Sequence, residues 1–151
     1  MSKLSSILKS EVELPQSKQL VLNLLCTNNH VADQYAVFFK SRGLTASQYN
    51  VLRILRGQKG KPANLSTIQE RMVHKNSNAG RLIDKLLIKG FVERNQCEVN
   101  RRKIEVRITN SGLQKLLDIA PDLEKIEEYG VRNLSIEEIK TLNSLLEKLR
   151  T

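Results

Sequence analysis

The sequence contains few aromatic residues and no long apolar run. Its aromatic residues are three Tyr and three Phe with no Trp, so a core must rest on Leu, Ile and Val. No run of about 18 apolar residues occurs, so we expect no membrane-spanning helix. Residues 1–14 mix Leu and Ile with Ser, Lys and Glu, and they lack the continuous apolar segment of a signal peptide. We therefore expect a cytoplasmic protein.

Cysteine and histidine are also scarce, which limits the chemistry that the chain can perform. Cys26 and Cys97 form no CxxC pair, which is typical of a reducing compartment. The only histidines are His30 and His74, and no cluster of His, Cys and carboxylate residues has metal-ligand spacing. Neither a Gly-rich phosphate loop nor a nucleophile paired with a base is present. We expect no enzyme activity, no metal and no cofactor.

The positive charge of the chain is concentrated in its middle third. The 151 residues, enough for one domain, carry a formal net charge of +9. Residues 53–107 contain 14 basic and 5 acidic side chains, whereas residues 108–151 contain 6 and 8. Such a basic block is typical of a nucleic-acid-binding surface, although a solvated face without a partner would carry the same charge.

The ends of the chain read as long helices. Apolar residues at helical spacing predict a first helix over about residues 17–42, roughly 39 Å long, which exceeds what one small core covers. Helical spacing resumes at Leu113 and pauses at Tyr129-Gly130. Ser135 and Glu138 form a capping box for a last helix with a Leu-rich stripe.

The basic middle third reads as three short helices followed by two strands. Thr45 and Gln48 form a capping box for a helix that ends at Gly57. A second box, Ser66 with Gln69, predicts a helix to about Val73, and after a short turn a further helix spans residues 76–89. The spacing of the apolar residues then changes to every second position, which predicts strands over residues 91–95 and 103–109. The fold class is mainly α with a small β-hairpin, a winged helix-turn-helix.

One face of the helix over residues 76–89 is suited to reading DNA. Asn and Arg side chains can make bidentate contacts to base edges in the major groove, and Ser66 and Thr67 could reach the phosphate backbone from the preceding helix. An ordinary amphipathic surface helix would also be polar outside, but less rich in Asn and Ser at its start. The expected contact residues of this segment are Lys75, Asn76, Ser77, Asn78, Arg81 and Lys85.

The hairpin loop, residues 96–103, ends in a run of cations. Three consecutive basic residues at a hairpin tip can enter a narrow minor groove. The expected contact residues of this wing are Asn100, Arg101, Arg102 and Lys103.

The segments LTASQYNVLRIL, LSTIQERMVHKNSNAGRLIDKLLIKGFVER and NRRKIEVRITNSG, in this order, resemble the MarR family. The resemblance spans the whole chain, 1–151. It implies a winged helix-turn-helix core over residues 44–112, with long dimerisation helices in residues 15–43 and 113–151. The wing of the family usually carries Asp-x-Arg, and here Asn100 stands in the Asp position. The charge-assisted pairing of that Asp with the Arg is therefore lost.

The resemblance also implies a homodimeric regulator of transcription that reads a pseudopalindrome in double-stranded DNA, by family habit a repressor. The expected effector is a small aromatic ligand or an oxidant. Two alternatives stay open. The first is a winged-helix module that binds protein instead of DNA. The second is a redox switch at Cys26, although a Cys in an amphipathic helix is more often a small buried apolar residue.

Overall fold

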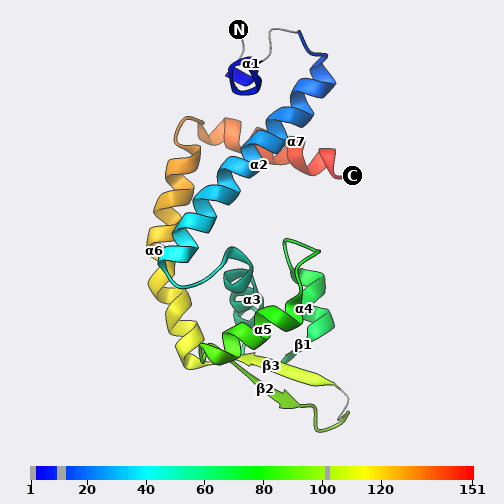
Figure 1. Cartoon of the computed structure of the whole chain (residues 1–151), viewed down its shortest axis with the longest axis vertical. Coiled ribbons are helices and arrows are strands. Elements are labelled where there is room, and N and C mark those ends of the chain that lie inside the picture. Colours follow the sequence, from blue (N-terminus) through cyan, green and yellow to red (C-terminus); the bar gives the residue numbers. More distant parts are fainter. Residues whose placement is uncertain (1–2, 10–12, 101–102) are drawn as a thin grey trace.

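The computed structural model describes residues 3–9, 13–100 and 103–151. It is elongated, with a domain of short helices and a small sheet at one end and long helices at the other (Figure 1). The elements in chain order are α1 Lys3–Leu8, α2 Gln16–Ser41, α3 Ala46–Arg56, β1 Ala63–Asn64, α4 Leu65–Arg71, α5 Ala79–Ile88, β2 Val92–Gln96, β3 Ile104–Ile108, α6 Asn110–Val131 and α7 Ile136–Leu149. This arrangement confirms the predicted fold class.

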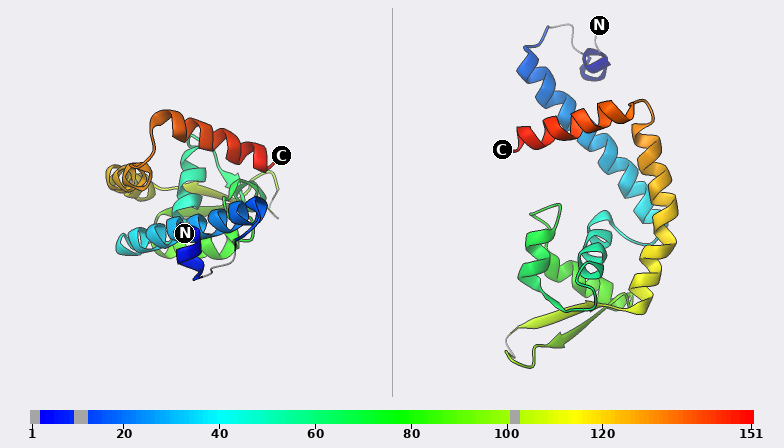
Figure 2. Two further views of the ribbon diagram at one scale, coloured as in Figure 1. Left: turned by 90° about the horizontal axis from the view of Figure 1, so that it is seen from above. Right: turned by 180° about the vertical axis from the view of Figure 1, so that it is seen from behind.

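The core lies almost entirely within the domain of short helices. Apolar side chains of α3, α4, α5 and β3 meet there, and α6 closes one side through Leu116 and Ile119. Helix α2 contributes Phe38 and Phe39 from its C-terminal end, whereas α7 contributes no buried residue. Most of α2 and all of α7 therefore project beyond this core, as the view from behind shows (Figure 2).

The sheet has one strand more than the sequence predicts. Strands β2 and β3 form the expected antiparallel hairpin, with Val92 opposite Ile108. The two-residue strand β1 pairs with the other edge of β3, with Ala63 opposite Val106, so the strand order is β1-β3-β2. Two residues are too short to show a period of two, so only the partner strand identifies β1.

Several helix boundaries are confirmed. Two of the three predicted capping boxes are present, at Thr45 with Gln48 and at Ser135 with Glu138. The long first helix ends within a residue of its predicted boundary, and Gly43 follows it with a φ of +72°, a conformation that suits glycine.

The starts of the two helices of the helix-turn-helix differ from the prediction. Helix α4 is capped by Asn64, whose side chain accepts a hydrogen bond from the Thr67 amide at 2.8 Å, so the predicted Ser66–Gln69 capping box is wrong. Helix α5 begins at Ala79 instead of residue 76, because Asn78 is its N-cap. The Asn78 side chain accepts a hydrogen bond from a backbone amide in the first turn of the helix, and such a cap favours a helix start at this position over an extension by one more turn.

Helix α6 is longer than predicted. Thr109 caps it, so it begins before Leu113, and it continues through Pro121 and Gly130 to Val131. The predicted pause at Tyr129-Gly130 is therefore wrong. Among the helices of the described residues, none combines the length and the hydropathy that a membrane crossing requires.

Candidate nucleic-acid interface

Helix α5 separates into a buried face and a charged face. Ala79, Ile83 and Leu86 are buried against the core, whereas Arg81 and Lys85 point to solvent. The predicted side-chain pattern of this helix is thus present. Lys75, Asn76 and Ser77 lie in the turn before the helix, so they precede its first turn instead of forming it.

The domain presents α4, the N-terminal end of α5 and the hairpin tip on the side away from α6 (Figure 1). These elements carry the predicted contact residues, which come from segments about 35 residues apart in the sequence. Arg101 and Arg102 lie outside the described residues, and Asn100 and Lys103 are exposed on either side of them. The Lys103 amide donates to the Asn100 carbonyl at 2.8 Å, which closes the tip of the hairpin.

Two of the predicted contact residues are already engaged within the protein. Asn78 Oδ1 accepts a hydrogen bond from the Arg81 amide at 3.0 Å, so a bidentate contact to adenine would have to break this cap. The Ser66 hydroxyl donates to Asn64 Oδ1 at 2.7 Å, so it would have to rotate to reach a phosphate. Arg81 and Lys85 have no such conflict with a helix cap.

An ion pair joins the recognition helix to the wing. Arg94 Nη1 of β2 lies 3.0 Å from Asp84 Oδ1 of α5. Asp84 is the only acidic residue of α5, so this pair balances the one negative charge that would face DNA phosphates. The sequence alone does not suggest the pair, because its members lie on two elements of different period.

The two cysteines lie apart from each other, in separate parts of the fold. Cys26 and Cys97 are half-buried free thiols, in α2 and at the end of the hairpin. His30 is one helical turn from Cys26, and its Nε2 lies 3.0 Å from Gln34 Nε2. In the part of the chain that the structure describes, no three His, Cys, Asp or Glu side chains gather as the ligands of a metal ion would.

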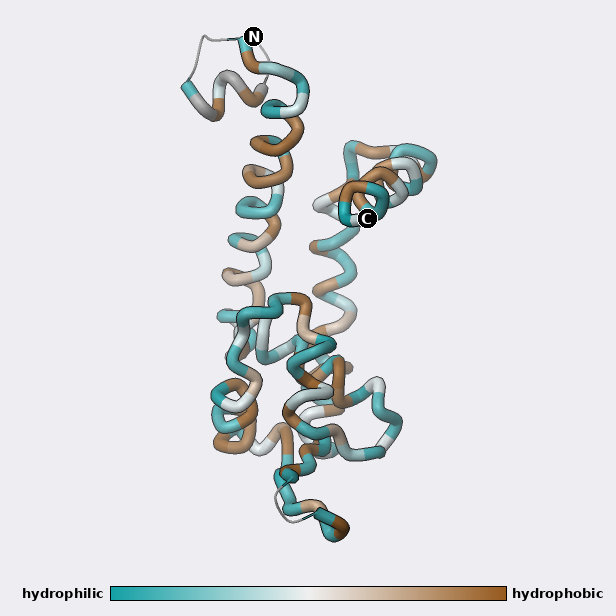
Figure 3. The backbone as a smooth tube through the Cα atoms, turned by 90° about the vertical axis from the view of Figure 1, so that its right-hand side faces the viewer, coloured by the Kyte–Doolittle hydropathy of each residue, from teal (hydrophilic) through white to brown (hydrophobic). Residues whose placement is uncertain are grey.

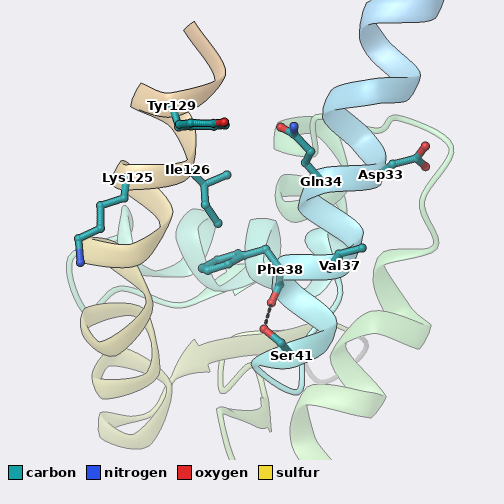
Figure 4. Close-up of a pocket in the computed structure, with 8 residues that line it drawn as sticks. All are labelled: Asp33, Gln34, Val37, Phe38, Ser41, Lys125, Ile126 and Tyr129. Carbon is teal, nitrogen blue, oxygen red and sulfur yellow. Dashed lines mark hydrogen bonds between the residues drawn. The ribbon is translucent and has the colours of Figure 1, made fainter. Parts of the chain in front are cut away.

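A pocket of about 760 Å³ lies between α2 and α6, above the DNA-binding domain. Gln34 and Phe38 of α2 face Ile126 and Tyr129 of α6 across it, whereas Asp33 and Lys125 point away (Figure 4). Its lining is mostly apolar. The sequence could not reveal it, because its two walls are far apart in the chain.

Polar contacts join the same two helices beside this pocket. The Tyr35 hydroxyl donates to Glu127 Oε1 at 2.7 Å, and burial, together with this bond and the charge of Glu127, raises the pKa of Tyr35 to about 12. Arg42 Nη2 lies 2.5 Å from Asp122 Oδ2. The angle between α2 and α6 is therefore set by specific bonds as well as by apolar packing.

Comparison with known proteins agrees with this geometry. Residues 44–104, from just before α3 to the first residue of β3, match the sequence profile of the MarR family. The chain is 29% identical over 125 residues to the transcriptional repressor YetL of Bacillus subtilis. The aligned region covers 80% of this chain and 73% of YetL. The structure is similar to that of a MarR transcription factor from Planctomyces limnophilus, with a TM-score of 0.71 and 28% identity over 91% of this chain and 98% of that one.

A third protein shares the fold at lower identity. The organohalide-sensing transcriptional regulator RdhR, in a form with 2,4-dichlorophenol bound, matches with a TM-score of 0.81 and 14% identity over 91% of this chain and 80% of that one. YetL and the Planctomyces limnophilus protein are named as a transcriptional repressor and a transcription factor, so these relatives are regulators of transcription and not enzymes. The chain thus resembles the MarR family of transcriptional regulators, whose profile its residues 44–104 match.

Proposed function

We propose that this chain binds double-stranded DNA in a sequence-specific manner, with α5 in the major groove and the wing in the minor groove. The observation that carries the proposal is the exposed face of α5, where Arg81 and Lys85 point outward while Asp84 is paired with Arg94. Arg is the side chain that reads guanine most often, through its O6 and N7 atoms.

The charge of the domain supports the same proposal. Residues 53–107, which contain α4, α5 and the wing, hold 14 basic and 5 acidic side chains. Lysine and arginine bind phosphates with release of counterions, so the affinity of such a surface for DNA falls steeply with salt.

We propose further that the protein acts as a homodimer through α2 and α7. Apolar side chains on these helices stay exposed in one chain, including Leu20 at 50% and Leu145 at 57% of their full area. The hydropathy view shows apolar residues running along the N-terminal half of α2 (Figure 3). A second copy would bury these faces and give the two recognition helices the symmetry of a pseudopalindrome.

Selection of bound sequences from a pool of random duplexes tests the DNA-binding proposal. We expect two half-sites in inverted orientation, separated by about one helical turn of 34–36 Å. The Kd for the selected duplex should rise roughly 10³-fold between 50 and 200 mM salt if six or more phosphates are contacted. A pool that yields no common sequence would instead favour a winged-helix module that binds protein.

Substitution of Arg81 tests the assignment of α5. We expect Arg81→Ala to weaken operator binding by about 1–3 kcal/mol and to relax the preference at one base pair. The matched control is Arg150→Ala at the end of α7, which removes the same charge from the opposite end of the molecule. Equal losses in both variants would show that only net charge matters.

We propose that the pocket between α2 and α6 binds a small aromatic effector. Its apolar lining by Phe38 and Ile126, with the hydroxyl of Tyr129 beside them, suits an aromatic ring with one polar group. The bound 2,4-dichlorophenol of RdhR is a compound of this class. Because the pocket lies between α2 and α6, next to the DNA-binding domain, a bound ligand that moves these helices apart would alter the spacing of the two recognition helices.

Titration with 2,4-dichlorophenol, followed by the melting temperature, tests the effector pocket. Ile126→Trp should fill the pocket and abolish the ligand-induced rise, whereas Leu117→Trp, on the exposed side of the same helix, should not. An equal rise in both variants would place the ligand elsewhere.

We also propose that the protein represses transcription and that it is located in the cytoplasm. The redox alternative requires that Cys26→Ser abolish a response to peroxide.

A further inference from the structure

The side chain of Gln69 links α4 to the start of the recognition helix with both ends of its amide. Gln69 Nε2 donates to the Lys75 carbonyl at 2.8 Å, and Gln69 Oε1 accepts from the Ala79 amide at 3.1 Å. Ala79 is the first residue of α5, and its amide is one of those that a helix leaves without a partner in its own backbone. Gln69 therefore acts as a second N-cap, supplied by another helix.

The turn that Gln69 holds has little other support from packing. Val73 is 76% exposed, and His74, Lys75 and Asn76 also point to solvent. Hydrogen bonds therefore hold this turn, one within it, from the Ser77 amide to the His74 carbonyl at 3.0 Å, and others at its two ends. At the beginning, Asn50 Oδ1 of α3 accepts from the Val73 amide at 2.9 Å, and at the end Gln69 holds Lys75 and Ala79.

The apolar packing of α5 fixes the helix at a different place. Its large buried side chains, Ile83 and Leu86, lie in the second turn and beyond, whereas the buried Ala79 of the first turn packs with only a methyl group. A small rotation about Ile83 and Leu86 would therefore displace the first turn. The first turn carries Arg81, the residue proposed to read guanine, and the turn before it carries Asn76, which the sequence predicts to reach a base edge. Hydrogen bonds to bases require donor–acceptor distances of about 2.7–3.2 Å, so displacement by one ångström would remove them.

We propose that Gln69 is a positioning residue for sequence recognition, which fixes the N-terminal end of α5 relative to α4. This inference rests on the proposed function, because it assigns to Gln69 the specificity of that same DNA surface. Gln69 itself contacts no base in this scheme. Loss of its bonds should therefore reduce the discrimination between sequences, while binding to phosphates by the basic domain persists.

The test compares Gln69→Met, which keeps the length of the side chain but makes neither bond, with Gln69→Glu, which keeps the acceptor for the Ala79 amide. The control is Gln114→Met in α6, where the amide donates to Asp118 at 2.8 Å, far from the turn. For each protein, the Kd is measured for the selected duplex and for an unrelated duplex of equal length. Hydrogen exchange of the Ala79 and Val73 amides is followed in the absence of DNA.

We expect Gln69→Met to reduce the ratio of specific to unrelated affinity by about tenfold or more, as for the loss of one good base contact. Exchange at Ala79 should accelerate about tenfold while exchange at Val73 stays unchanged, because Asn50 still holds it. Gln69→Glu should restore part of the affinity ratio, although its charge lowers binding to both duplexes alike. Gln114→Met should match the wild type in every measurement.

Two results would overturn the positioning role alone. One is an affinity ratio in Gln69→Met within twofold of the wild-type ratio. The other is a parallel loss for both duplexes together with a lower melting temperature and unchanged exchange at Ala79, which would show a general structural role. If the wild type itself prefers no sequence, the proposed function fails first, and the positioning role fails with it.

Discussion

Arg94 Nη1 in β2 lies 3.0 Å from Asp84 Oδ1 in α5, so the wing and the recognition helix are joined by an ion pair outside the core. The two elements would enter neighbouring grooves of the same duplex. The pair offsets the one negative charge of α5 and leaves Arg81 and Lys85 as its unopposed cations.

The pair between Asp84 and Arg94 should contribute little to stability. Both side chains are well exposed, at 44% for Arg94 and 59% for Asp84, so water and salt screen their attraction. A double-mutant cycle with Asp84→Asn and Arg94→Met should give a coupling free energy of unfolding below about 1 kcal/mol, falling further with added salt. A coupling above 2 kcal/mol, or one that salt leaves unchanged, would contradict this expectation.

Two glycines of α6 should respond to alanine in opposite directions. A Cβ at Gly112 would lie 2.3 Å from the Phe91 carbonyl oxygen and 2.8 Å from Ile108 Cγ1, so Gly112→Ala must push α6 away from the sheet. We expect it to cost about 2 kcal/mol or more in the free energy of unfolding, as overpacking does. At Gly130 nothing lies within 4 Å, so Gly130→Ala should stabilise the helix by up to about 1 kcal/mol. Chemical denaturation of both variants measures the difference, and a loss of stability in Gly130→Ala would contradict the continuous helix.

The bond between Tyr35 and Glu127 should appear in the alkaline pH dependence of stability. The pKa of Tyr35 is about 12 in the folded chain and 10.0 in its unperturbed state, so the folded protein holds this proton more tightly. The stabilisation is complete below pH 10 and is lost as the pH rises from about 10 to 12. Tyr35→Phe should therefore lose less stability than the wild type over this interval. Absorbance at the wavelength of tyrosinate should show that the variant lacks the phenol that ionises near pH 12, and identical titration curves would contradict the assignment.

A charge on the apolar face of α7 should dissociate the proposed dimer. Leu142 is 45% exposed in one chain, so Leu142→Lys costs little unless another chain covers it. In a two-fold interface the substitution acts twice, and at about 1.5–3 kcal/mol for each buried Leu the dissociation constant should rise roughly 100-fold or more. Sedimentation equilibrium measures this change, with Ser144→Lys on the opposite face of α7 as the control. Equal association of both variants would place the interface elsewhere.

The elements defined by short-range signals could be predicted from the sequence. The capping boxes at Thr45 and Ser135, the helical spacing of α2 and the alternation of β3 each depend on residues a few positions apart. Both residues of a capping box lie in one short segment, and so do the apolar residues that define a helical or strand period. Interactions within that segment are therefore enough to form the element. The charge block over residues 53–107 likewise indicates a nucleic-acid surface, because the positions of charged residues along the chain suffice to locate it.

The features that connect distant segments required the tertiary structure. Gln69 fits the pattern of a local capping box with Ser66, yet its amide bonds to the turn and to Ala79, because Asn64 already caps α4. Strand β1 exists through its pairing with Val106, and the pocket exists because α2 and α6 diverge above the domain. A side-chain amide or a two-residue strand can form hydrogen bonds of similar free energy with several partners. Only the packing of the whole domain selects one of these partners. The sequence by itself therefore determined most of the longer helices, the two strands of the hairpin and where the charge lies, while the tertiary structure decided which distant segments and side chains join them.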